Sequence, residues 1–226
     1  MIVITGASSG LGRAIFDKME ADNHRLTNWS LNTGVNITDF VSTQAAAKEL
    51  PAKVDVLINC AGVNGIDFMP EVAEAEWDRI MDTNAKGIFL CSQALLPKLR
   101  GGTILNIVSN AAHLAMTSSA AYCASKAAAW QLTRQMAREL IKTHGITVFS
   151  VSPNKLAGTA MSHTIDRRVC ALRGWTPEQA KKYQLDALPA GEETDVSTLA
   201  EFIAFLLSTK ERHKYLNGCD IQYGGP

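Results

Sequence analysis

The sequence predicts a single α/β domain built on a doubly wound parallel sheet. Short apolar runs alternate with longer helical patterns along the 226 residues. The apolar runs are nearly continuous and do not alternate with polar residues, which is typical of strands that are buried on both faces of a parallel sheet. A strand followed by a helix, repeated along the chain, gives βαβ units with right-handed crossovers. We find no repeat, linker or low-complexity segment that divides the chain, so residues 1–226 are expected to form one domain.

The same patterns give the expected order of elements. Strands are expected at 2–5, 26–29, 54–59, 103–108, 146–151 and 219–222, with a very short one at 35–37. Helices are expected at 11–21, 40–50, 74–99, 119–143 and 196–207. Only the segment LNTGV separates the second strand from the short third one, so this connection is shortened. Residues 155–190 are polar and irregular, helical in places, and lie where a lid over a substrate would be placed.

Composition narrows the class of protein. A formal net charge of zero gives no reason to expect nucleic acid or an anionic membrane as a partner. No apolar run approaches the roughly 18 residues that span a bilayer, and the first strand leaves no room for a signal peptide. The five cysteines are scattered without a CxxC pair, which favours free thiols in a reducing cytosol over a disulfide or metal framework. We therefore expect a cytoplasmic protein without a metal site.

A glycine-rich turn, TGASSGLG, follows the first strand and contains Gly6, Gly10 and Gly12. Glycines between a strand and a helix let backbone amides approach a phosphate, and the helix N-terminus adds its dipole. An ordinary tight turn is the alternative, and a glycine motif alone is weak evidence. The position of this turn, at the first strand of a βαβ chain, favours phosphate binding.

Five motifs then occur in a fixed order. They are TGASSGLG, NCAG at 59–62, Asn84 in DTNAKGIFL, Ser109 in ILNIVSNAA, and YCASK at 122–126. Together they resemble the short-chain dehydrogenase/reductase family of tyrosine-dependent oxidoreductases. The resemblance continues through LPAGEETDVSTLAEFIAFLLS and YLNGCDIQYGG, and covers nearly the whole chain. It implies a Rossmann-type fold and an NAD(P)-dependent transfer of hydride between nicotinamide and a carbonyl compound or secondary alcohol, without naming that substrate.

The predicted catalytic residues are Asn84, Ser109, Tyr122 and Lys126. Tyr122 and Lys126 are four residues apart and share one helix face. The pKa of a free phenol is about 10, and a nearby ammonium and a cationic nicotinamide ring would both lower it, so that Tyr122 can act as general acid or base. By resemblance, Ser109 hydrogen-bonds the reacting oxygen, Lys126 holds the nicotinamide ribose, and the amide of Asn84 holds a water that connects Lys126 to solvent. Each residue alone has an ordinary structural explanation; their order and spacing favour catalysis.

The resemblance also assigns the cofactor contacts. They are Gly6, Ser8, Ser9, Gly10, Leu11, Gly12, Ser30, Asn36, Ile37, Asn59, Ala61, Gly62, Tyr122, Lys126, Pro153, Asn154 and Thr159. Ser30 stands 18 positions after Gly12, where NAD-preferring members carry an aspartate for the adenosine ribose. NADP-preferring members have a nearby arginine, which is also missing. Because serine can hydrogen-bond a 2′-phosphate and no carboxylate repels it, we expect a slight preference for NADP(H) over NAD(H).

Four further departures from the family pattern bear on the site. Asn36 replaces an aspartate that contacts adenine, and Cys60 replaces an asparagine, which we interpret as core packing. Asn154 replaces a glycine after Pro153, and asparagine tolerates the left-handed backbone better than most residues. Thr159 stands for a threonine that contacts the nicotinamide carboxamide, with its spacing off by one.

The lid and the oligomeric state are less defined. Residues 155–190 hold six Lys/Arg against three Asp/Glu, a bias that could select an anionic substrate, although a solvated helix face is the favoured explanation. The side chains that the lid offers for contact with a substrate are Met161, His163, Arg167, Arg168, Arg173, Trp175, Lys181 and Tyr183. By resemblance, a homodimer or homotetramer is expected through the two long helices, and the small residues at 127–129 fit such packing.

Two other functions stay open at this point. One is a non-enzymatic dinucleotide sensor or scaffold on the same fold, which the four predicted catalytic residues argue against. The other is an epimerase or dehydratase that returns its hydride.

Overall fold

A computed structural model describes residues 1–208 and 210–225. The strands are β1 (Ile2–Thr5), β2 (Leu26–Trp29), β3 (Val56–Asn59), β4 (Thr103–Ile107), β5 (Thr147–Pro153) and β6 (Asp220–Tyr223). The helices are α1 (Gly10–Ala21), α2 (Phe40–Lys48), α3 (Glu74–Met81), α4 (Gly87–Leu95), α5 (Ala120–His144), α6 (Ala160–Arg173), α7 (Pro177–Asp186) and α8 (Val196–Ser208). Short helical turns lie at η1 (Leu31–Thr33), η2 (Met69–Glu71), η3 (Asp82–Lys86), η4 (Asn110–Ala112) and η5 (Lys210–Leu216).

The six strands form one parallel sheet in the order β2-β1-β3-β4-β5-β6. β1 pairs with β2 on one side, with Ile2 opposite Leu26, and with β3 on the other, with Ile2 opposite Val56. The chain thus reverses its direction of winding between β1 and β3. In open α/β sheets, ligands bind at the carboxyl ends of the strands beside this reversal.

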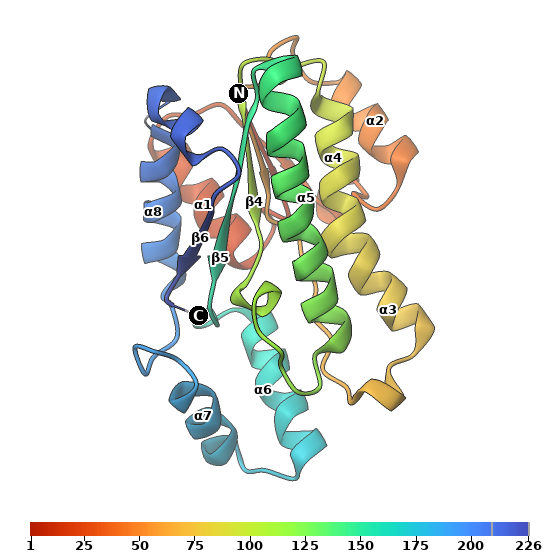
Figure 1. The fold of residues 1–226 in the computed structure, drawn as a ribbon, viewed down its shortest axis with the longest axis vertical. Helices are drawn as coiled ribbons and strands as arrows, with labels where there is room; N and C mark the ends of the chain where they lie inside the picture. The colour runs from red at the N-terminus through yellow and green to blue at the C-terminus, as the bar shows by residue number, and fades with distance from the viewer. Residues whose placement is uncertain (209, 226) are drawn as a thin grey trace.

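Helices cover both faces of the sheet, as Figure 1 shows. Alternate residues of each strand point to opposite faces. On β1, Ile4 packs in a core with α1 and α8, whereas Val3 packs in a second core with α4 and α5. All of β3 and β4 is buried, as expected for a parallel sheet that is covered twice. The predicted fold class is therefore confirmed.

The expected strand at 35–37 was wrong. After β2 the chain makes the turn η1, in which the side chain of Ser30 and the side chain of Thr33 cap each other's backbone, and then enters α2. A parallel crossover needs about a dozen residues, and the few residues available here do not allow one. Ile37 is buried instead in the core beside Gly87, and β2 is left as an edge of the sheet.

The expected single helix at 74–99 is divided. α3 ends at Met81, η3 is one π-helical turn, and α4 ends at Leu95, shortly before Pro97. Proline lacks a backbone N–H and ends a helix. Single π-turns inside α-helices occur frequently at functional sites, and this one contains Asn84.

The segment 155–190 folds as two helices beyond the carboxyl ends of the strands. α6 and α7 lie at the end of the molecule away from the N-terminus (Figure 1). This placement suits the lid that the sequence predicts. Among the described residues, no helix has both the length and the apolarity to cross a bilayer.

Candidate active site

The glycine turn between β1 and α1 has the shape of a cradle for an anion. A Cβ on Gly6 would lie 2.7 Å from the Cα of Ala61, and one on Gly12 would lie 2.4 Å from the carbonyl oxygen of Gly6. Both glycines therefore allow close backbone packing. Gly10 has φ +53°, and the nearest atom to its would-be Cβ is Cγ2 of Thr159 at 3.9 Å. The cradle is thus open above Gly10.

The N-terminus of α1 offers this cradle unpaired donors. Ser9 is the N-cap residue, but its side chain makes no capping hydrogen bond, and the first turn contains no acidic residue. The first amides of a helix carry a partial positive charge and need acceptors. The residues present therefore fit a pyrophosphate, which would supply acceptors to these amides.

Neutral hydroxyl and amide groups line the neighbouring end of β2. The Oγ of Ser8 lies 2.7 Å from the Oγ of Ser30, and Nδ2 of Asn28 donates to Ser8 at 3.1 Å. The Oδ1 of Asn28 accepts from the backbone N–H of Ala7 at 3.1 Å, so Asn28 connects β2 to the glycine turn. The sequence analysis missed Asn28; its position directly before Trp29, at the carboxyl end of β2, was the available signal.

Asn36 and Ile37 lie apart from this cluster. The Oδ1 of Asn36 accepts from the backbone and the hydroxyl of Thr38, and Ile37 is buried in the core. No contact in the described residues joins either side chain to the glycine turn. Their expected adenine contacts remain predictions.

The NCAG segment connects β3 to both halves of the site. The backbone amides of Cys60 and Ala61 donate to Oγ1 of Thr5, each at 3.0 Å. A Cβ on Gly62 would lie 3.3 Å from Oδ1 of Asn84 and 3.7 Å from Nζ of Lys126, so a glycine here gives both side chains room. Cys60 packs against the core of α1 and α8, as predicted, and burial raises the pKa of its thiol to about 12.

Asn59 belongs to a buried network behind this segment. Its Nδ2 donates to Oδ1 of Asn106 at 2.8 Å, and Nδ2 of Asn106 donates to Oγ1 of Thr133 at 2.9 Å. These three side chains are at most 2 % exposed. Asn59 therefore joins the carboxyl end of β3 to β4 and, through Asn106, to α5.

The side chain of Asn84 is fully buried in the π-turn and already engaged. Its Oδ1 accepts from the backbone N–H of Val63 at 2.8 Å, and its Nδ2 donates to the carbonyl oxygen of Val63 and to Oγ of Ser125, both at 2.9 Å. The hydroxyl of Ser125 in turn donates to the carbonyl oxygen of Tyr122 at 2.8 Å. Asn84 thus connects the loop after β3 to Ser125 of α5, the residue before Lys126. Both protons of its amide group are used in these hydrogen bonds. A water held by this amide could bond only to Oδ1.

Lys126 is a buried cation beside Tyr122. Its Nζ donates to the carbonyl oxygen of Ile107 at 3.1 Å and lies 5.8 Å from the centroid of the Tyr122 ring. Burial lowers the pKa of Lys126 to about 8, with a small opposing contribution from Cys60. The ammonium and the phenol therefore share one helix face, as their spacing predicts.

The protein groups move the pKa of Tyr122 in the direction opposite to our prediction. Burial raises the pKa of this phenol, a hydrogen bond from Ser109 lowers it, and Cys123 raises it slightly. Removal from water thus outweighs the hydrogen bond from Ser109, and Lys126 is itself buried and bonded to Ile107. Tyr122 is consequently protonated at neutral pH.

Pro153, Asn154 and Thr159 follow the carboxyl end of β5. Pro153 is the last residue of β5, and Nδ2 of Asn154 donates to the carbonyl oxygen of Gly224 at 3.0 Å. Asn154 does not adopt a positive φ, so the left-handed backbone anticipated there is not used. Thr159 caps α6, accepting from Ser162 N at 3.0 Å, and its methyl group approaches Gly10.

Four of the six Lys/Arg side chains of the lid form ion pairs with acidic side chains. Lys155 pairs with Glu193 at 2.9 Å and with Asp166, and Lys181 pairs with the same Glu193 oxygen at 2.8 Å. Lys182 pairs with Asp186 at 2.6 Å.

The remaining lid cations are also engaged. Arg168 pairs with Asp67. The guanidinium of Arg173 stacks on Trp175 at 4.8 Å and on Tyr183 at 5.1 Å. The guanidinium of Arg167 donates to Oγ1 of Thr164 at 3.4 Å, and His163 and Met161 are exposed. Most of the positive charge of the lid is therefore paired with acidic side chains, whereas Arg167 and Arg173 keep their charge.

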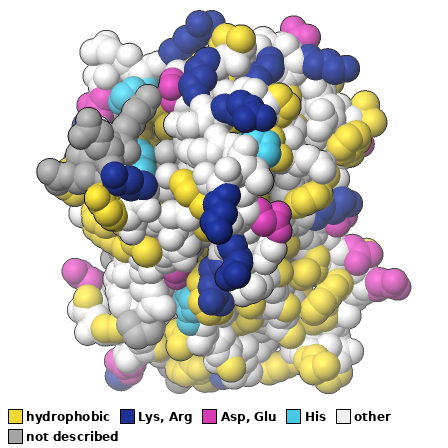
Figure 2. All heavy atoms as spheres, turned by 45° about the horizontal axis from the view of Figure 1, so that its top comes forward, with side chains coloured by type: hydrophobic (Ala, Val, Ile, Leu, Met, Phe, Trp, Pro, Cys, Tyr) yellow, Lys and Arg dark blue, Asp and Glu magenta, His cyan; other side chains and the backbone are white. Residues whose placement is uncertain are grey.

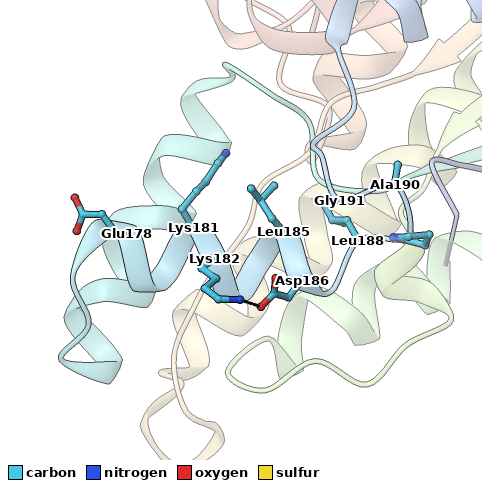
Figure 3. A pocket seen from close by; sticks show the side chains of 9 residues that line it. Glu178, Lys181, Lys182, Leu185, Asp186, Leu188, Ala190 and Gly191 are labelled. Carbon is cyan, nitrogen blue, oxygen red and sulfur yellow. Dashed lines mark hydrogen bonds and ion pairs between the residues drawn. The ribbon is translucent and has the colours of Figure 1, made fainter.

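A groove along α7 and the segment that follows it does not include the predicted catalytic residues. Figure 3 shows it along α7, between Glu178 and Gly191, with Leu185 and Leu188 among the lining residues. None of the predicted catalytic residues lines it.

Comparison with known proteins agrees with this geometry. The family model for short chain dehydrogenase matches residues 28–169. The chain belongs to the short-chain dehydrogenase family. It is 30% identical to 3-oxoacyl-[acyl-carrier-protein] reductase FabG of Staphylococcus aureus, over 99% of this chain and 96% of that protein. The family resemblance, the oxidoreductase class acting on CH–OH or C=O groups, and NAD(P)(H) as the cofactor class are thereby confirmed.

Solved structures share the fold. Sorbitol-6-phosphate 2-dehydrogenase SrlD from Erwinia amylovora superposes with a TM-score of 0.91 at 23% identity, covering 100% of this chain and 98% of that one. A variant of actinorhodin polyketide ketoreductase with NADPH gives a TM-score of 0.85 at 22% identity, covering 99% and 95%.

Proposed function

We propose that this short-chain dehydrogenase reduces the carbonyl group of a small molecule with NADPH, and that Tyr122 is its general acid. The observation that carries the proposal is that Tyr122 lies beside both Ser109 and Lys126, and that Nζ of Lys126 bonds to the carbonyl oxygen of Ile107 at the carboxyl end of β4, near Gly62. When bound, the nicotinamide cofactor supplies or accepts the hydride.

The protein groups divide the remaining work. Tyr122, held protonated by burial, donates its phenolic proton to the carbonyl oxygen of the substrate. The hydroxyl of Ser109 donates a hydrogen bond to the same oxygen as negative charge develops there. The Lys126 ammonium stabilises the phenolate left on Tyr122. In the oxidative direction these roles reverse, and the phenolate accepts the alcohol proton.

Neutral groups around Ser8 and Ser30 support the preference for NADP(H). Three hydroxyl or amide side chains, Ser8, Asn28 and Ser30, cluster there without a carboxylate among them. A 2′-phosphate could accept from these donors without repulsion. The ketoreductase solved with NADPH is consistent with this preference.

The first experiment is a fluorescence titration with NADPH and, separately, with NADH. We expect tighter binding of NADPH. Turnover is then followed by nicotinamide absorbance with a panel of carbonyl compounds that includes a 3-oxoacyl thioester, the substrate class in the name of the Staphylococcus relative. Binding without any turnover across the panel, in both directions, would favour a sensor. Conversion of substrate without a net change in absorbance would favour an epimerase.

Tyr122→Phe tests the catalytic assignment. Loss of general acid catalysis is expected to lower kcat by roughly 10²–10⁴-fold, while the NADPH dissociation constant stays within about twofold. Tyr215→Phe, at a 76% exposed tyrosine outside the lid, is the matched control. Full turnover by Tyr122→Phe would remove Tyr122 from the mechanism.

We also propose that the protein is a cytoplasmic homodimer or homotetramer. Its five cysteines are free, as suits a reducing compartment. Trp77 on α3 and Phe89 on α4 are 40% and 45% exposed, on the helices expected to pair.

A further inference from the structure

His113 and Ser109 are the two ends of one hydrogen-bonded turn. Ser109 caps η4, and its carbonyl oxygen accepts from the N–H of Ala112 at 2.9 Å. The N–H of His113 donates to the carbonyl oxygen of Asn110, also at 2.9 Å. Movement of His113 is therefore transmitted to Ser109 through three residues of tight turn.

The imidazole of His113 is held on two sides. Its Nε2 lies 2.8 Å from Oδ2 of Asp220, and its ring packs edge-to-face against Trp130 of α5, with centroids 4.7 Å apart. The guanidinium of Arg134 also lies against Trp130, 5.2 Å from the ring. The side chains of His113 and Asp220 are only 16% and 8% exposed.

Asp220 in turn is fixed by β5. Its Oδ1 accepts from Oγ of Ser150 at 2.5 Å and from Oγ of Ser152 at 2.8 Å. A buried carboxylate needs such donors. Both serines donate to the carboxylate and neither bonds to His113, so this cluster is not arranged to generate a nucleophile. Its geometry is that of an anchor at the end of the sheet.

A second tie joins the same two segments. Nδ2 of Asn110, inside η4, donates to the carbonyl oxygen of Gly225, just after β6. The turn that carries Ser109 is thus attached twice to the C-terminal strand.

We propose that His113 is a positioning residue, whose bond to Asp220 fixes η4 so that Ser109 stays within hydrogen-bond reach of Tyr122. This rests on the proposed function, in which Ser109 and Tyr122 act on one oxygen. A misplacement of about 1 Å in an active site can lower a rate by about 10²-fold, so the anchor has a measurable effect on catalysis.

The test has an arm that needs no turnover. The four tyrosines are replaced by 3-fluorotyrosine, which lowers their phenol pKa, and each is titrated by ¹⁹F NMR. Tyr122 is assigned by its absence in Tyr122→Phe. Lys126, Cys123 and the Ser109 hydroxyl are the groups that bear on this phenol. In His113→Ala the hydrogen bond from Ser109 is weakened, and the pKa of Tyr122 is expected to rise by up to about one unit.

Two further variants distinguish loss of the position of Ser109 from a general destabilisation of the surrounding structure. His113→Gln keeps an amide donor at a reach similar to Nε2 and is expected to return the Tyr122 titration toward that of the wild type. Asp220→Asn keeps the shape of the anchor but loses its charge, and is expected to act like His113→Ala. His24→Ala, at an exposed histidine before β2, is the matched control and should leave the titration unchanged.

The second arm measures catalysis once a substrate is in hand. His113→Ala is expected to lower kcat about tenfold and to leave the NADPH dissociation constant within about twofold. An unchanged Tyr122 titration in folded His113→Ala and Asp220→Asn would overturn the proposal, as would failure of His113→Gln to restore it. If the wild type shows no turnover, the proposed function fails, and the NMR arm still decides whether His113 positions Ser109.

Discussion

At the scale of one residue, burial of the Lys126 ammonium in the proposed active site lowers the free energy of unfolding of the protein. Its pKa of about 8 in the folded protein lies below the value of 10.5 for an exposed lysine. Between these values the unfolded chain binds more protons, so stability rises with pH across this window and is lost as pH falls through about 8. Lys126→Met should therefore increase the free energy of unfolding at pH 7 by at most about 3 kcal/mol, less about 1 kcal/mol for the lost bond to Ile107.

Urea unfolding at several pH values checks this prediction. The advantage of Lys126→Met over the wild type should shrink as the pH rises from 7 toward 10, while turnover is lost at every pH. Lys86→Met, at an exposed lysine in the same π-turn as Asn84, is the control and should show neither effect. A constant difference between Lys126→Met and the wild type over this range would mean that Lys126 does not titrate with a lowered pKa.

Ser30 is the residue at which the cofactor preference can be reversed. A carboxylate in its place would repel a 2′-phosphate and accept from both ribose hydroxyls. Ser30→Asp is expected to weaken NADPH binding by roughly tenfold or more, and to strengthen NADH binding. Asn32→Asp adds the same charge to an exposed position of the same turn. Equal losses in the two variants would point to general electrostatic repulsion and away from a contact at Ser30.

At the scale of the element, two glycines with a positive φ allow the effect of backbone strain to be distinguished from an effect on ligand binding. Gly10 and Gly34 have φ of +53° and +79°, and neither would meet a close atom if a Cβ were added. Alanine at either position should therefore cost about 1 kcal/mol of stability, because the left-handed backbone disfavours a side chain. Only Gly10 lies in the cradle. Gly10→Ala alone should weaken NADPH binding, by about tenfold or more, in a fluorescence titration beside Gly34→Ala.

The helices and strands also show which features of the fold can be predicted from the sequence. Nearly continuous apolar runs predicted the central strands β1, β3, β4 and β5, because burial on both faces leaves a strong pattern. The edge strands β2 and β6 were also predicted, although most of their residues are only partly buried. The spacing of Tyr122 and Lys126 predicted their shared face, because helix geometry alone decides it. The strand at 35–37 was wrong because its apolar residues belong to the core beside α4, and apolarity does not distinguish the two fates.

The features that the sequence analysis did not predict depend on contacts between residues that are far apart in the chain. The π-turn at Asn84 is stabilised by Val63, 21 residues away, and no local pattern encodes that bond. The raised pKa of Tyr122 depends on burial by several elements together. The pairing of His113 with Asp220 spans 107 residues, and no local pattern encodes it.

At the scale of the whole molecule, the fold itself accounts for the basic surface. Figure 2, in which the end opposite the lid is turned toward the viewer, shows several Lys and Arg side chains on this face. The helices that follow the parallel strands run back toward this end, and α1, α2 and α5 carry basic residues in their last turns, namely Lys18, Lys48, Lys142 and His144. Cations at helix C-termini are stabilised by the helix dipole. This surface needs no anionic partner to explain it.

Assembly is the last property that belongs to this scale. If two copies pair through α3, α4 and α5, a charge at Phe89 must be buried without a partner, which strongly disfavours association. Phe89→Glu should lower the molar mass measured by light scattering to that of a smaller assembly, whereas Phe40→Glu, at a 54% exposed position of α2, should not. Because Tyr122 and Lys126 lie on α5, dissociation should also lower turnover. An unchanged mass for Phe89→Glu would place any interface elsewhere, and a monomeric wild type would exclude the homo-oligomer altogether.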